Sequence, residues 1–186
     1  MNIKKHSYSE NIFNKRILIF GPKIPPIGGV SVHIERLSII YEKNNNLIKI
    51  FDCTSEIIGQ NKISYMFKIF KSINNFGPDI IDYHTSFLKF YIPELFVLVF
   101  LKLLFRFKIN IVDHDPRYLY KKNYLEKKIL NFLLKFVNKQ VIIGSSTYQS
   151  YLDNKIKINN NCSIESPFLP PDSSNLENLL KTLNKK

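Results

Sequence analysis

The sequence predicts an α/β fold, a doubly wound parallel sheet of about six strands with helices on both faces. Three observations indicate it. Short apolar runs alternate along the chain with segments whose apolar residues recur at helical spacing. The runs are apolar throughout, which is typical of strands that are covered on both faces. The 186 residues, 45% hydrophobic and 23% charged, suit one globular domain.

The predicted elements alternate regularly. We expect strands at residues 16–20, 47–53, 79–83, 108–112, 140–144 and 162–165. We expect helices from about residue 31, at 63–73, at 93–106, at 124–137 and at 147–152. The pairs Gly21-Pro22 and Gly77-Pro78 mark the ends of the first strand and of the second helix.

The two ends of the chain differ in composition from its middle. Residues 1–15 predict a flexible polar leader without the apolar segment of a signal peptide, so we expect a cytoplasmic protein. Residues 16–171 carry the alternating elements and predict the domain. Residues 172–186 predict a polar, linker-like tail with a short exposed helix.

The net charge of +12 indicates an anionic partner, although a lysine-rich solvated surface explains it equally well. No recognised nucleic-acid motif accompanies the charge, so nucleic acid is not an expected partner. The most apolar stretch, residues 95–105, contains Lys102 and is followed by Arg106, well short of the roughly 20 apolar residues of a membrane span. Residues 87–106 and 121–139 are candidate faces for an anionic membrane surface, or else core helices with solvated lysines.

Glycine and polar residues follow four of the predicted strands. They are Gly28 and Gly29 after the first strand, His84 after the third, Asp113, His114 and Asp115 after the fourth, and Ser145 after the fifth. Ligands of open parallel sheets bind beyond the carboxyl ends of the strands, so these residues define the predicted site.

The glycine pair allows positive φ and close approach of a ligand to the backbone. A helix beginning near Ser31 would direct free amides at a phosphate, while a simple tight turn is the alternative. The loop lacks the third glycine of a dinucleotide fingerprint and the lysine of a P-loop.

His84 and His114 are two of only four histidines, and their common position favours a polar site over two structural histidines. Asp113 and Asp115 either orient His114, bind a sugar hydroxyl or cap the next segment. Neither a Ser-His-Asp order nor zinc-ligand spacing is present, so we expect no metal. Cys53 and Cys162, each in a predicted strand, are expected to be buried apolar thiols.

The order of these motifs resembles the family-4 glycosyltransferases, which have the GT-B fold of two Rossmann-like domains. Residues 17–34, ILIFGPKIPPIGGVSVHI, resemble the opening of that family. Residues 78–86 resemble the third strand of that family with its D-x-x-x-x-H element, and residues 112–115 resemble its fourth-strand H-D. Residues 143–152 resemble its serine segment, and residues 166–171 resemble the end of its N-terminal domain. The resemblance implies the N-terminal, acceptor-side domain of a retaining enzyme of bacterial polysaccharide or capsule biosynthesis.

The resemblance also implies roles for individual residues. His114 is expected near the donor sugar as the catalytic residue, and Gly28 and Gly29 against the donor diphosphate. His84 and Ser145 are expected on the acceptor side, with Asp115 also binding substrate. The implied co-substrate is a UDP- or GDP-linked sugar, with no further cofactor. The implied acceptor is a glycan or a lipid-linked glycan. A lipid-linked acceptor would place the protein at the inner face of the cell membrane.

The sequence departs from the family in one respect. The family holds the nucleotide mainly in its C-terminal domain, with a Glu-x7-Glu pair, and no two glutamates here have that spacing. We therefore expect the donor domain to be absent, through truncation or as a separate polypeptide, and the chain alone to be inactive. The alternative is a non-catalytic module with a Rossmann-like fold that binds a membrane surface or an anionic ligand.

Overall fold

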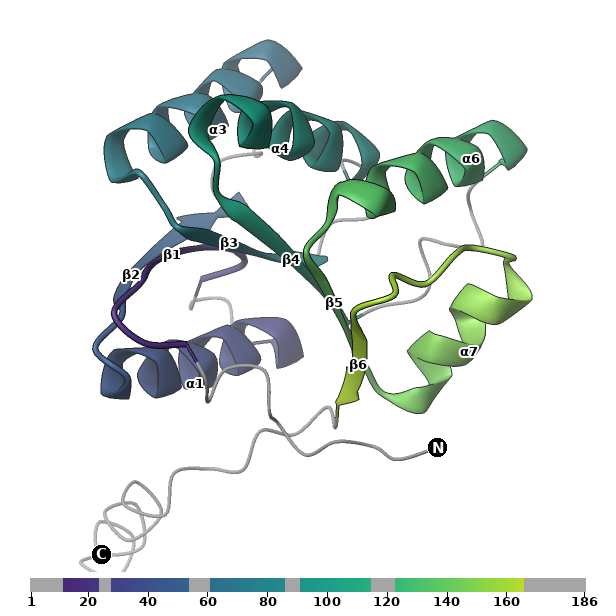
Figure 1. Cartoon of the computed structure of the whole chain (residues 1–186), viewed down its shortest axis with the longest axis horizontal. Coiled ribbons are helices and arrows are strands. Elements are labelled where there is room, and N and C mark those ends of the chain that lie inside the picture. Colours follow the sequence, from purple (N-terminus) through teal and green to yellow (C-terminus); the bar gives the residue numbers. More distant parts are fainter. Residues whose placement is uncertain (1–11, 24–27, 54–60, 86–90, 115–122, 166–186) are drawn as a thin grey trace, which may run out of the picture.

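A computed structural model describes residues 12–23, 28–53, 61–85, 91–114 and 123–165. Its six strands form one parallel sheet in the order β2-β1-β3-β4-β5-β6 (Figure 1). The strands are β1 Arg16–Gly21, β2 Leu47–Asp52, β3 Ile80–Thr85, β4 Lys108–Asp113, β5 Lys139–Ile143 and β6 Cys162–Glu165. The helices are α1 Gly29–Lys43, α3 Lys62–Phe76, α4 Tyr91–Phe105, α6 Tyr124–Leu133, the 3-10 helix η1 Leu134–Phe136, and α7 Ser145–Asp153. The predicted doubly wound parallel sheet is confirmed.

The sheet separates two apolar clusters. On one face α1 packs Ile34 and Leu37 against Ile17 and Ile19 of β1. The opposite face is covered by α3, α4 and α6 (Figure 1), whose apolar residues form one cluster with those of β3 and β4. Tyr151 of α7 belongs to this second cluster. The chain order reverses between β1 and β3, so the topological switch point lies between these two strands.

Some element boundaries differ from the prediction. The first helix begins at Gly29, two residues before the predicted start at Ser31. The Ser31 hydroxyl accepts a hydrogen bond from the Gly28 N–H at 2.9 Å and donates one to the Gly28 carbonyl, which extends the helix toward the glycines. The predicted helix at 124–137 ends at Leu133 and tightens into η1.

Both cysteines are free thiols, but only Cys53 is buried as predicted, whereas Cys162 is partly exposed. Cys53 is buried, although it lies one residue beyond β2 and not inside it. Burial raises the pKa of the Cys53 thiol, and burial also raises that of Cys162 to about 12. Thiols with raised pKa values stay protonated and unreactive at neutral pH.

Two of the predicted regions fall largely outside the description. Residues 1–11 of the expected leader and the whole expected tail lie outside the described residues. Ile12 and Lys15 are tied to the turn before β2, since Asn46 donates to the Ile12 carbonyl and accepts from the Lys15 N–H, both at 2.8 Å. Within the described ranges no helix combines the length and apolarity that crossing a bilayer requires.

Candidate functional site

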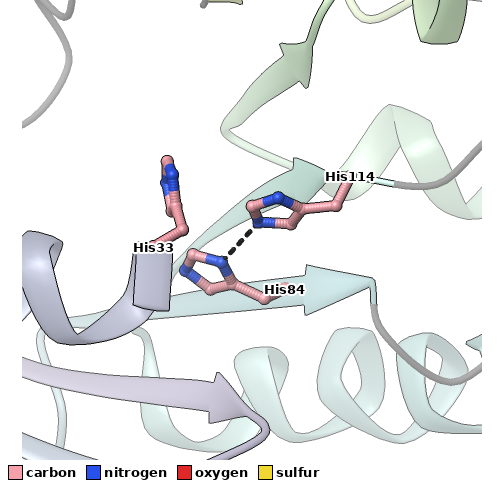
Figure 2. A group of neighbouring side chains, drawn as sticks. All are labelled: His33, His84 and His114. Carbon is pink, nitrogen blue, oxygen red and sulfur yellow. Dashed lines mark hydrogen bonds between the residues drawn. The ribbon is translucent and has the colours of Figure 1, made fainter. Parts of the chain in front are cut away.

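Three histidines meet at the carboxyl edge of the sheet, beside the switch point. His84 is the penultimate residue of β3, His114 directly follows β4, and His33 lies in the second turn of α1. Their rings converge from three separate elements (Figure 2). His33 and His84 are buried, with exposed fractions of 4% and 1%, whereas His114 is partly exposed.

The rings are in direct contact. Nδ1 of His84 and Nε2 of His114 are joined by a hydrogen bond of 2.9 Å, and these two rings stack with centroids 5.2 Å apart. The His33 ring meets His114 edge-on at a centroid distance of 4.8 Å and lies 5.7 Å from His84. One nitrogen of each ring lies within 4.8 Å of those of the other two. We call this group the histidine cluster.

Strand geometry explains why His84 and His114 share a face. Side chains alternate between the two faces of a strand, so residues two apart point the same way. Asp82 lies two residues before His84 and accepts hydrogen bonds from Tyr41 of α1 and, at 2.8 Å, from Asn110 of β4. The carboxylate of Asp82 therefore points toward α1, and His84 follows it on that face.

The same alternation excludes one predicted role. Asp113 precedes His114 and points to the opposite face, where Tyr151 and, at 3.1 Å, Gln140 donate hydrogen bonds to its carboxylate. The exposed fraction of Asp113 is zero. The expectation that Asp113 orients His114 or binds a sugar is therefore wrong, because this carboxylate is enclosed in the core beneath α7.

Gly21, at the end of β1, makes room for the cluster. A Cβ at this position would lie 2.4 Å from the side chain of Ile34 and 3.2 Å from Cβ of His84. A side chain here would require the terminal methyl of Ile34 to move and His84 to give way slightly. The glycine therefore leaves room for Ile34 of α1 beside His84 of β3.

Gly28 and Gly29 form the exposed N-terminus of α1. Gly28 has an extended backbone, with φ of −147°, and Gly29 is the first helical residue, so neither uses the positive φ that the sequence suggested. A Cβ at Gly29 would meet no atom within 4 Å. What the pair provides is open space in front of the first amides of α1, where a helix favours an anion.

Burial determines the protonation of the cluster. It lowers the pKa of His114 to about 3, with the neighbouring His33 adding a smaller effect in the same direction. Burial also lowers the pKa of His84, and the neighbouring His114 and then His33 lower it further. Both imidazoles are therefore neutral at pH 7, and each ring carries one N–H and one nitrogen lone pair.

The remaining predicted residues lie apart from the cluster. Ser145 is exposed and begins α7 after β5, and the histidine contacts that the structure describes do not include it. Asp115 lies outside the described residues. His33 was missed as a site residue, although the segment that resembles the family opening contains it. The predicted helix already contained His33, and only the packing of α1 against the sheet shows that its ring meets the strand histidines.

Comparison with known proteins extends this description. No protein-family model matches the chain, and no curated protein matches it. Crystal structures of Anabaena Alr3699/HepE are similar in fold, the complex with UDP at a TM-score of 0.52 and the complex with UDP-glucose at 0.53, both at 11% identity. The matches cover 91% and 92% of this chain but 50% of the HepE chain, so the chain spans about half the length of that protein.

These matches agree with the class of fold expected from the sequence. The chain is a Rossmann-like α/β domain that matches half of a GT-B structure. In particular, its fold resembles one half of HepE.

Proposed function

We propose that this chain is the acceptor-side half of a retaining glycosyltransferase, which moves a sugar from a nucleotide sugar to a glycan or lipid-linked acceptor. The position of the site carries the proposal. The open N-terminus of α1 and the histidine cluster occupy the carboxyl edge of the sheet at the switch point, where nucleotide ligands of such sheets bind. The likeness to half of a structure that holds UDP-glucose supports the same class of ligand.

The geometry suits the chemistry of glycosyl transfer. Departure of a nucleoside diphosphate builds negative charge, which fixed backbone amides and a helix dipole stabilise without reorganisation. Gly28 and Gly29 leave this helix end accessible to a diphosphate.

His114 is the residue of the cluster that can reach a ligand. Its Nε2 is engaged by His84, while its Nδ1 lies on the side of the ring away from His84 (Figure 2). A neutral His114 offers that nitrogen to a hydroxyl of the donor sugar. His84, which is 1% exposed, is then a positioning residue that holds the tautomer and orientation of His114.

The proposal requires a second, donor-binding half, either elsewhere in a longer protein or in a separate polypeptide. The 186 residues alone are then expected to release no nucleoside diphosphate from UDP-glucose or GDP-linked sugars in the presence of glycan acceptors. Turnover at the usual rates of enzymes, above about 1 per second, would contradict a half-cleft.

Titration of the isotopically labelled chain with UDP-glucose, followed by NMR, tests the site. We expect weak binding with shifts at the Gly28 and Gly29 amides and at the His114 ring. Gly29→Ala is expected to reduce these shifts without changing the fold, because its Cβ projects into open space. A basic hollow of about 560 Å³ beside β2, lined by Lys49 and Lys71 among others, is the competing anion site. Shifts confined to that hollow would overturn the assignment.

One surface favours a second function, attachment to an anionic membrane. The face formed by α3, α4 and α6 exposes large apolar side chains: Phe67 64%, Phe96 60%, Phe100 55%, Leu103 70%, Leu104 61% and Phe132 56%. Two of them, Phe96 and Phe132, also line an apolar groove of about 700 Å³ between these helices. Exposed apolar side chains on helices that also carry lysines are typical of interfacial binding.

Sedimentation with phosphatidylglycerol vesicles tests the attachment. We expect binding that weakens at high salt and is absent with phosphatidylcholine alone. Leu103→Glu should abolish it, whereas Leu152→Glu on α7, at a residue 48% exposed, should not. Equal loss in both variants, or no binding to anionic vesicles, would remove this function.

A further inference from the structure

The histidine cluster has the composition of a transition-metal site. Three imidazoles from α1, β3 and β4 bring one nitrogen each within 4.8 Å of the other two (Figure 2). Neutral imidazole is the histidine form that binds Zn²⁺, Cu²⁺ and Ni²⁺, whereas Mg²⁺ and Ca²⁺ prefer oxygen ligands.

One nitrogen of the cluster has an unmet bonding need. Nδ1 of His84 is bonded to His114, but Nε2 of His84 is fully buried and has no hydrogen-bond partner among the described residues. An unsatisfied buried polar group destabilises a fold. A ligand that bonded this nitrogen would remove that penalty.

We propose that His33, His84 and His114 bind one divalent first-row transition ion, with Zn²⁺ as the representative ion. Three histidine ligands leave a fourth position for water or an oxygen ligand. This position lies on the side of His114, the one partly exposed member. The site is not apparent from sequence spacing, because its ligands come from three elements far apart in the chain.

The required adjustment is small. Tetrahedral Zn²⁺ with Zn–N bonds of about 2.0–2.1 Å places ligand nitrogens about 3.3 Å apart. Ligand nitrogens that now lie within 4.8 Å of one another would therefore close by about 1.5 Å at most. Rotation of the His33 and His114 rings about their side-chain torsions is sufficient for changes of this size.

The test uses the full chain after removal of metal with a chelator. Calorimetric titration with Zn²⁺ is expected to show one site per chain and a raised Tm, and Co²⁺ is expected to give the visible absorption of a tetrahedral site without a thiolate charge-transfer band. Mg²⁺ should produce neither effect. Binding needs no nucleotide sugar, so the result is independent of the proposed transferase function.

Variants assign the ligands. His33→Gln and His114→Gln should each weaken Zn²⁺ binding at least 10- to 100-fold, since even changes to outer-shell partners of metal ligands have that effect. His6→Gln is the matched control, because His6 is the one histidine outside the cluster. His114 is partly exposed, so its variant is informative even if changes at buried His84 prevent folding. Absence of stoichiometric Zn²⁺ binding would overturn the proposal. It would also be overturned if His6→Gln or Cys162→Ser lost Zn²⁺ binding while the variants of the histidine cluster retained it.

Discussion

Acidification is expected to destabilise the fold through the histidine cluster. The pKa of His114 is lowered to about 3, whereas an unfolded chain has a histidine pKa of about 6.5. Below pH 6.5 the unfolded chain therefore binds a proton that the folded chain does not, so stability is complete above that pH and falls as the pH decreases toward 3. Integrating this linkage between pH 7 and pH 5 gives a loss of about 2 kcal/mol in the free energy of unfolding for His114. His84, whose pKa is also lowered, adds a loss of the same sign.

Urea unfolding followed by circular dichroism at pH 7 and pH 5 measures the effect, with metal excluded by a chelator. The comparison is between the native chain and His114→Gln, because other titrating groups then largely cancel. Glu94 is one such group, since burial raises its pKa and gives it the opposite pH dependence. The native chain should lose about 2 kcal/mol more than the variant between the two pH values, whereas His6→Gln should behave like the native chain. Equal losses in native and His114→Gln chains would refute the claim that His114 is held neutral by burial.

Three further predictions concern stability and are measured by urea or thermal unfolding. Gly21→Ala should lower the free energy of unfolding by about 1–3 kcal/mol, because its Cβ would lie 2.4 Å from the side chain of Ile34. Gly29→Ala should leave the free energy of unfolding unchanged or raise it by up to about 1 kcal/mol. Equal effects of the two variants would contradict the contact between position 21 and Ile34. Glu94→Ala should cost about 2–4 kcal/mol, since two buried tyrosine hydroxyls lose their acceptor, and Glu94→Gln should cost less; the reverse order would contradict this. Tyr151→Phe should cost about 1–3 kcal/mol by removing a donor to the buried carboxylate at the end of β4, and an unchanged Tm would disprove that role.

Local patterns in the sequence were sufficient for the architecture. Each predicted strand is present, with its ends within about two residues of the expected positions, because a strand buried on both faces must be apolar along its whole length. The apolar helices between them are present for the same reason. Parallel strands joined by helices then bring His84 and His114 to the same edge, which is the part of the site that the sequence anticipated.

Other features of the site depended on packing. The sequence placed Asp113 beside His114 as a potential partner, but the pleat turns it to the opposite face, where Tyr151 and Gln140 bind it. The sequence also gave no reason to group His33 with the strand histidines. That grouping depends on how α1 packs beside β3 and β4.

The sequence by itself determined a parallel α/β domain, an open glycine pair after its first strand and two histidines at the carboxyl edge. Tertiary structure alone decided that His33 joins them, that His84 is buried behind His114, and that Asp113 is excluded. The physical reason is that hydrophobic periodicity is a local property, which each segment carries regardless of its neighbours. The face on which a side chain lies, and the partner that it meets there, are determined by strand register and helix packing between segments distant in the chain.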